Sequence, residues 1–438
     1  MSNYFPGLMV GSVPFAGWSL FNVGDTFSFT ASYVIGFIVL IINLPLLIIK
    51  FNYKIDRHFF TFYGPLIAGC IISFVSLFFW DYANFLQYFL SFIHLCFFVL
   101  VTYCLLQVSN IDKALNFYAA IYTFIGVLVA IIGLVDLVFV LNTGSGLGIE
   151  FNTIARTIPS DTTIGSLPRA SSIFFEPGWF AHYLLINIIL IMAWLLPRAN
   201  MAGNKLKILS LQLSLILMLM ALIATLSASA YLVLGMIILF FILNRPKPIR
   251  TLIFIMFIFF LLSLIPFPND LPNPLAATAE RFSGLLTGNH VAGESVDARS
   301  GELAAAYKIF SDTMFLGSGY GQSTYYISSA TDVGTGGISS FYGILMAETG
   351  LIGLFAFVGS IFLLNYKLWR QHKIVMKNCQ YRAQIIFCAQ CMILAETIFL
   401  NFFSAMASAT YVTSFWFALL VVGDRGGIFV NSNHPKKG

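Results

Sequence analysis

Charged residues are so rare in this chain that they decide what it can fold into. Its 438 residues include only 23 Lys and Arg and 18 Asp and Glu, together 9%, whereas 59% are hydrophobic and 46 are Phe. A soluble domain typically carries about 25% charged residues, and this chain lacks the polar surface to cover so large an apolar core. The composition therefore excludes a soluble enzyme, a nucleic-acid-binding protein and a disordered chain. It predicts an all-α polytopic membrane protein, because helices satisfy their own backbone hydrogen bonds in lipid.

Twelve segments are long and apolar enough to cross a bilayer, which takes about 20 mostly apolar residues. Together they form one predicted membrane domain over residues 1–438. The first segment is the weakest, because Gly7, Gly11 and Pro14 interrupt it. The predicted spans are 6–22, 27–49, 60–79, 85–107, 115–141, 173–197, 207–224, 228–244, 250–267, 341–365, 383–402 and 406–423.

The distribution of Lys and Arg predicts the orientation of these spans. With the N-terminus inside, 18 of the 23 cationic residues fall on the inner side, and every inner loop carries at least one. Both termini are then expected in the cytoplasm; if 6–22 does not span, only the N-terminus moves outside. The five outer cations are Arg156, Arg169, Arg281, Arg299 and Lys308.

Two outer loops are long, 142–172 and 268–340, and loops of this length in a compact protein are usually functional. The outer loops contain no Cys, so no disulfide framework is expected there. No cluster of His, Asp and Glu residues has the spacing of a metal site, and no metal or other cofactor is expected.

The segment that leads into span 173–197 combines an outer cation with a broken backbone. Arg169 is followed by Glu176, Pro177 and Gly178, and the last two disfavour a regular helix. Irregular backbone at membrane depth is tolerated where it is buried in protein or lines a cavity, and an acid there needs a partner. Arg169 is thus a candidate functional residue, although a structural ion pair with Glu176 explains the pattern equally well.

The large outer loop contains a predicted helix that starts near Ala298 and carries Arg299 and Glu302, which are close enough to form a surface pair. The helix is followed by Gly317-Ser-Gly-Tyr-Gly321, and such a run lets backbone N–H groups converge on an anion.

The tenth predicted span opens at Ser339 and places Glu348 about two turns into the membrane, among small residues that suit close helix packing. Besides Glu176 near the outer interface, Glu348, Glu396 and Asp136 are the acids within predicted spans. Each is a functional candidate, and hydrogen-bonded structural acids are an equal alternative.

Four segments, in chain order, resemble motifs of the O-antigen polymerase/ligase superfamily. They are Arg169-Ala-Ser-Ser-Ile-Phe-Phe-Glu-Pro-Gly-Trp-Phe-Ala181, Ala224-Thr-Leu-Ser-Ala-Ser-Ala-Tyr231, Arg299 with Gly317-Ser-Gly-Tyr-Gly321, and Ser339-Ser-Phe-Tyr-Gly-Ile-Leu-Met-Ala-Glu-Thr-Gly-Leu-Ile-Gly353. In the ligases the fourth motif opens with a histidine held to be catalytic. Ser339 stands there in this chain, which favours a Wzy-type polymerase over a ligase. The Arg of the second motif is also missing, with Ala228 or a neighbour in its place.

The resemblance implies a GT-C-like membrane glycosyltransferase of the bacterial inner membrane, active on the periplasmic side in O-antigen or lipopolysaccharide synthesis. Its donor and acceptor would be glycans linked to undecaprenyl diphosphate. Its further partners would be the lipid bilayer and a chain-length regulator protein, and no nucleic acid is expected to bind. Because the leaving group is already a diphosphate, Arg side chains can neutralise it without a metal.

Catalytic roles are assigned on this basis to Arg169, Arg299, Glu176 and Glu302, and substrate binding to Arg281, Gly319, Tyr320, Gly321, Ser339, Tyr342, Trp179 and His182. The general base stays open among Glu176, Glu302, another acid of the large loop, His182 and His290. The aromatic residues fit sugar stacking or interfacial anchoring equally.

Three other functions remain as alternatives. A ligase would attach the glycan to a different acceptor. A flippase or transporter is an alternative from a different class. Two features argue against it: the two halves of the chain are unlike, and transport does not need a 73-residue outer loop. A non-catalytic assembly factor would not need outer arginines.

Overall fold

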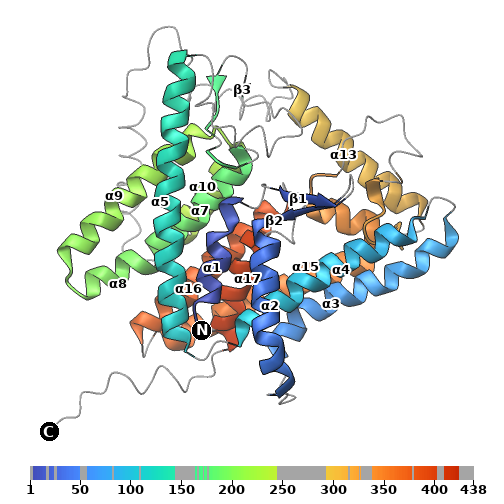
Figure 1. Ribbon diagram of the computed structural model, residues 1–438, viewed down its shortest axis with the longest axis horizontal. Coiled ribbons are helices and arrows are strands. Elements are labelled where there is room, and N and C mark those ends of the chain that lie inside the picture. The colour runs from blue at the N-terminus through green and yellow to red at the C-terminus, as the bar shows by residue number, and fades with distance from the viewer. Residues whose placement is uncertain are drawn as a thin grey trace.

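The computed structural model describes residues 3–15, 19–23, 27–49, 57–80, 83–107, 110–143, 163–164, 167–170, 172–174, 177–243, 293–313, 316–324, 326, 338–376, 379–401 and 409–423. Within these residues the chain is a bundle of helices, as Figure 1 shows. The helices are α1 (Phe5–Gly11), α2 (Ala31–Ile49), α3 (Arg57–Ser73), α4 (Phe85–Leu106), α5 (Ile111–Thr143), α7 (Pro177–Leu190), α8 (Leu196–Met201), α9 (Lys205–Ala224), α10 (Ala228–Leu243), α13 (Gly293–Asp312), α15 (Phe341–Val375), α16 (Gln380–Phe399) and α17 (Ala409–Gly423).

Short irregular elements join some of these helices. A 3-10 turn (Phe74–Phe79) extends α3, and a π turn (Ile191–Leu195) joins α7 to α8. Two antiparallel hairpins, β1 (Ser19–Val23) with β2 (Phe27–Thr30) and β3 (Thr163–Ile164) with β4 (Leu167–Pro168), depart from the predicted all-α class.

Among the residues that the structure describes, seven helical segments are long and apolar enough to cross a membrane: α3 with its 3-10 extension, α4, α5, α7–α8, α9, α15 and α16. Three shorter apolar helices, α2, α10 and α17, coincide with further predicted spans. The chain is therefore a multi-pass helical membrane protein. The predicted span 250–267 lies outside the described residues.

The prediction of a helical span over 6–22 is wrong. The helix α1 ends at Gly11, a 3-10 turn occupies Val13–Phe15, and strand β1 begins at Ser19. The interruptions at Gly11 and Pro14 are the physical reason, since neither residue favours continuation of a helix. The segment is buried against α5, and Ser12 is buried beside Ser32, so protein rather than lipid surrounds the irregular backbone.

Cationic residues from several helices make contacts at one end of the bundle, the end that the orientation prediction places inside. Arg198 contacts Asn116 and lies 5.1 Å from the ring centroid of Tyr381, while Lys367 Nζ lies 3.0 Å from His58 Nδ1. These contacts gather the predicted inner ends of five helices, α3, α5, α8, α15 and α16. The N-terminal segment reaches the same end, because Asn3 accepts a hydrogen bond of 2.9 Å from the backbone N–H of Asn110. Which end faces the cytoplasm remains a prediction.

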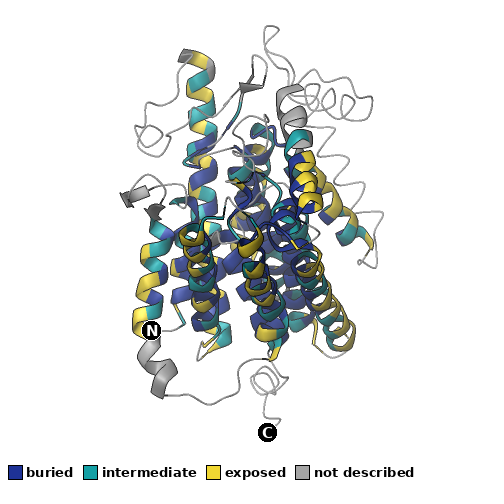
Figure 2. Ribbon diagram, turned by 90° about the vertical axis from the view of Figure 1, so that its right-hand side faces the viewer, coloured by how far each residue is buried: buried dark blue, intermediate teal, exposed yellow. Residues whose placement is uncertain are grey.

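Burial separates a central set of helices from a peripheral set, as the colours of Figure 2 show. Every residue of α7 from Phe180 to Leu190 is buried, and α16 and α17 are nearly as enclosed. By contrast, α9 exposes Leu206, Leu209 and Leu213, as a lipid-facing helix does. The protein core is thus formed by α7, α16 and α17, and helices such as α4 and α9 separate it from lipid.

The helix α15 is long but not continuous. Gly350 has φ 65° and ψ −161° inside it, a backbone conformation that breaks the helical hydrogen-bond pattern. The expected close packing by small residues is confirmed nearby, because a Cβ built on Gly69 of α3 would lie 2.7 Å from Gly353 Cα. The outer helix α13 packs on α15. It begins at Gly293, five residues before the predicted start.

Candidate functional site

The first and second sequence motifs meet at the predicted outer end of the bundle. The backbone N–H of Ala170 donates to the carbonyl oxygen of Ala224 (2.9 Å), and Arg169 Nε donates to the carbonyl oxygen of Thr225 (2.9 Å). Arg169 is half-buried. The turn between α9 and α10 therefore positions the guanidinium of Arg169, which was predicted from the sequence as a functional residue.

Unusual backbone supports this junction on both sides. Ser172 has φ 53° and Leu226 has φ 49°, values that residues with side chains adopt rarely. The Ser172 hydroxyl donates to the carbonyl oxygen of Val129 in α5 (2.8 Å). The segment before α7 is thus fixed to α5 as well as to the α9–α10 turn.

The fourth motif is fixed to the large outer loop by one carboxylate. Glu302 of α13 accepts a hydrogen bond from the backbone N–H of Ser339 (2.9 Å) and a second from its hydroxyl. Both residues are half-buried. The structure therefore joins Glu302 to the position where ligases of the resembling superfamily carry a histidine.

The same motif is anchored to the end of α16. The backbone N–H of Phe341 donates to the carbonyl oxygen of Leu400 (2.8 Å), and the Tyr342 hydroxyl donates to that of Thr397 (2.8 Å). Ser340 caps α15, since its hydroxyl accepts from the backbone N–H of Gly343 (3.2 Å). Tyr342 remains half-buried beside the Ser339–Glu302 contact.

The glycine run of the third motif encloses an anion, and that anion belongs to the chain. The backbone N–H of Gly321 donates to Glu348 Oε2 (2.8 Å), and Ser323 donates to Glu348 Oε1 through its N–H (3.2 Å) and its hydroxyl (2.6 Å). The N–H of Gly319 binds the Glu348 carbonyl oxygen (3.0 Å), and that of Tyr320 binds Ser73 Oγ (3.2 Å). These N–H groups are therefore already paired within the protein, which corrects the expectation that they face a substrate anion.

The pairing of the glycine run with Glu348 was not predicted from the sequence, although each was a candidate by itself. The available signal was Gly350, two residues after Glu348, because a helix broken there exposes backbone groups that a loop can bind.

Removal of the Glu348 carboxylate should destabilise the protein. Glu348→Ala leaves three buried donors on Gly321 and Ser323 unpaired, at about 1–3 kcal/mol for each unsatisfied group. We expect a clear fall in the Tm of the purified protein, and a smaller one for Glu348→Gln, which keeps one acceptor oxygen. An unchanged Tm for the alanine variant would contradict this role.

Two glycines give a matched test of the same loop. Gly317 has φ 84°, and a Cβ there would lie 2.5 Å from Glu348 C and O, whereas a Cβ on Gly359 in α15 meets nothing within 4 Å. Gly317→Ala should lower stability by at least about 1–2 kcal/mol through its left-handed backbone alone, while Gly359→Ala should be neutral or stabilising. Thermal unfolding of both variants measures the difference; equal Tm values would show that the loop relaxes freely.

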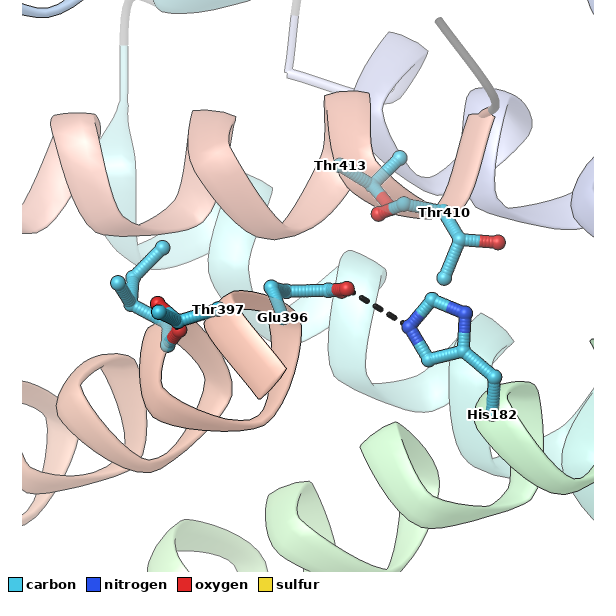
Figure 3. Close-up of polar contacts among 6 residues, drawn as sticks. His182, Glu396, Thr397, Thr410 and Thr413 are labelled. Atoms are coloured by element: carbon cyan, nitrogen blue, oxygen red, sulfur yellow. Dashed lines mark hydrogen bonds and ion pairs between the residues drawn. The ribbon is translucent and has the colours of Figure 1, made fainter. Parts of the chain in front are cut away.

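His182 lies in the core rather than at the outer surface. Its Nε2 lies 2.7 Å from Glu396 Oε2, a contact drawn as the dashed line in Figure 3, and both side chains are fully buried. The ring contacts Phe399 and Tyr411. Trp179, about one turn outward on α7, is half-buried. His182 is therefore part of a buried pair. Of the candidate membrane acids, Glu348 and Glu396 both bind groups of the protein, and Asp136 is half-buried in α5.

The remaining predicted site residues are less fully described. Arg299 lies in α13, on the same helix as Glu302, but its side chain is outside the described part. Glu176, Arg281 and His290 lie outside the described residues. The described candidates therefore form two groups: Arg169 at the α9–α10 turn, and Glu302, Ser339 and Tyr342 where α13 meets α15.

The fold defines a polytopic helical membrane protein, in which Arg169 binds the α9–α10 turn and Glu302 joins α13 to the start of α15. A family model described as O-antigen ligase matches residues 213–358. This match includes the second, third and fourth motifs, and it confirms the resemblance to the O-antigen polymerase/ligase superfamily over this part of the chain. A comparison with curated proteins gave no match.

Proposed function

We propose that this protein polymerises oligosaccharide repeat units linked to undecaprenyl diphosphate in the synthesis of O-antigen or a related surface polysaccharide. It transfers the growing chain from its lipid diphosphate to a sugar hydroxyl of a new lipid-linked repeat. The family match supports a glycosyltransferase of the O-antigen ligase and polymerase type. The enzyme acts at the periplasmic face of the inner membrane, and a chain-length regulator is a further proposed partner.

The contact between Glu302 and Ser339 carries the polymerase proposal. A ligase-type histidine is absent at 339, and the Glu302 carboxylate binds that residue instead. A carboxylate can act as general base when it lies within hydrogen-bond reach of the proton that it accepts. Glu302 is half-buried and thus reachable from the outer surface. We assign it the role of accepting the proton of the acceptor hydroxyl.

The bond changes then balance without a further reactant. The acceptor oxygen forms a bond to the anomeric carbon of the donor chain, and the bond from that carbon to the diphosphate oxygen breaks. The proton passes to Glu302, and undecaprenyl diphosphate leaves with the electron pair. Arg169, with Arg299 and Arg281, binds the charge that develops on the diphosphate, since guanidinium groups bind phosphate oxygens in a bidentate manner.

Reconstitution of the purified protein with a lipid-linked repeat as the only substrate tests the proposal. We expect longer lipid-linked chains, and we expect synthesis to continue with a chelator present, because the arginines rather than a metal neutralise the leaving group. Movement of the lipid between leaflets without elongation would favour a flippase. Transfer only to a different acceptor would favour a ligase, and complete loss with chelator that added metal restores would contradict the metal-free mechanism.

A further inference from the structure

The centre of the bundle contains a set of buried polar atoms that the proposed reaction does not use. We call this set the polar core cluster; it comprises Tyr118, Tyr122, Tyr183, Tyr411, Ser414 and Glu396. Their side chains come from α5, α7, α16 and α17. All six residues are fully buried. Among the described residues, no hydrogen-bond partner is found for the hydroxyls of Tyr122 and Tyr411, for Ser414 Oγ or for Glu396 Oε1, whereas the hydroxyls of Tyr118 and Tyr183 lie within reach of Thr413 and Asn187.

These side chains are neighbours in space. The rings of Tyr118 and Tyr122 lie 5.4 Å apart, and Tyr122 stacks on Tyr183 at 5.0 Å. The ring of Tyr411 lies 5.1 Å from that of His182, whose Nε2 contacts Glu396. The Glu396 carboxylate also lies within electrostatic reach of the Tyr118, Tyr122 and Tyr411 side chains. The unpaired atoms thus surround one acidic group.

A dry cluster of this kind would be strongly unfavourable. Each buried polar group left without a partner costs about 1–3 kcal/mol, and a carboxylate in an apolar core costs more. Lipid cannot supply partners, because the cluster is enclosed by protein. Water can, since a buried water molecule needs two to four polar groups. Tyrosine and serine hydroxyls donate and accept, and the carboxylate accepts.

We propose that the polar core cluster is an internal binding site for ordered water in the middle of the membrane domain. The bound water bridges the tyrosine and serine hydroxyls to Glu396 Oε1, while Oε2 is held by His182. This water keeps the pair of Glu396 and His182 hydrated. The pair is linked to the candidate site through Thr397, the residue after Glu396, whose carbonyl oxygen accepts a hydrogen bond from Tyr342. This inference does not depend on the proposed reaction.

Radiolytic hydroxyl-radical footprinting of the unmodified protein in detergent or nanodiscs tests it, because X-rays generate radicals from water bound next to buried side chains. We expect Tyr122 and Tyr411 to be oxidised several-fold faster than Tyr88. Tyr88 is a matched control that is also buried but donates its hydroxyl to the Cys70 carbonyl oxygen (2.7 Å). Water bound in the cluster should exchange slowly with the bulk. Oxygen-18 from labelled solvent should therefore appear only slowly in the oxidised Tyr122 and Tyr411. Oxidation of Tyr122 and Tyr411 at the rate of Tyr88 would overturn the proposal.

Tyr→Phe variants give a second readout with opposite signs. If water binds the hydroxyls, Tyr122→Phe and Tyr411→Phe remove hydrogen bonds and lower the Tm, as Tyr88→Phe does. If the hydroxyls are dry, the same substitutions remove unsatisfied polar atoms and raise the Tm. A raised Tm in both variants would therefore contradict a hydrated site, whatever the activity of the protein in chain extension.

Discussion

Replacing Arg169 with alanine is expected to lower chain extension by about 10²–10³-fold, the usual effect of removing a group that stabilises developing charge in a transition state. Its guanidinium is held by the hydrogen bond from Nε to the Thr225 carbonyl oxygen, so its position is set by the α9–α10 turn. Arg169→Lys should restore little activity, because a lysine ammonium lacks the planar fork that binds a diphosphate. The measurement is the length of lipid-linked glycan made by the purified variant.

Arg370 provides a matched control for this experiment. It is an exposed cation of α15 at the opposite end of the bundle, and Arg370→Ala should leave extension unchanged. Membrane levels and the Tm of each variant separate lost chemistry from lost folding, since Arg169 also supports the junction of two motifs. Long-chain glycan from a folded Arg169→Ala protein would rule out the diphosphate contact.

Glu302→Gln should reduce the rate of extension by about 10²–10⁴-fold, the range typical of general acid–base catalysis. The glutamine keeps an oxygen that can accept from Ser339, so the junction of α13 with α15 should persist while the base is lost. The measurement is the initial rate at which each purified protein lengthens a lipid-linked repeat.

Asp312 is the control on the same helix. Its carboxylate is exposed and accepts a hydrogen bond from the Tyr326 hydroxyl (3.0 Å), and no catalytic role is assigned to it. Asp312→Asn should therefore retain extension. Equal losses in the Glu302 and Asp312 variants would indicate a structural role for the carboxylates of α13 and would leave the general base to another acid.

The sequence predicted local features well. Ten of the twelve predicted spans coincide with helices of the described residues, because uninterrupted apolar runs determine where a chain crosses lipid. The first predicted span failed at Gly11 and Pro14, where the chain ends α1 and continues without a helix inside a protein environment. Hydropathy cannot distinguish this case, since an apolar segment buried in protein has the same composition as one buried in lipid.

The candidate site was predicted in part. Arg169 and Glu302 were identified because outer charges are few and stand next to motifs, and Arg169 indeed meets the second motif at Thr225. The glycine run was expected to bind a substrate anion, whereas the backbone N–H of Gly321 binds the carboxylate of Glu348, 27 residues further along the chain. His182 was expected near substrate and instead pairs with Glu396, 214 residues away.

What the sequence by itself determined is the class of protein, the position of most spans and the short set of charged residues that matter. These follow from composition and local periodicity, and each is a property of a short stretch of chain. Only the tertiary structure decided which polar groups are partners. The pairing of Glu348 with the glycine run, of Glu302 with Ser339 and of His182 with Glu396 depends on how helices distant in sequence pack, because a buried polar group must find its hydrogen bond wherever the fold supplies one.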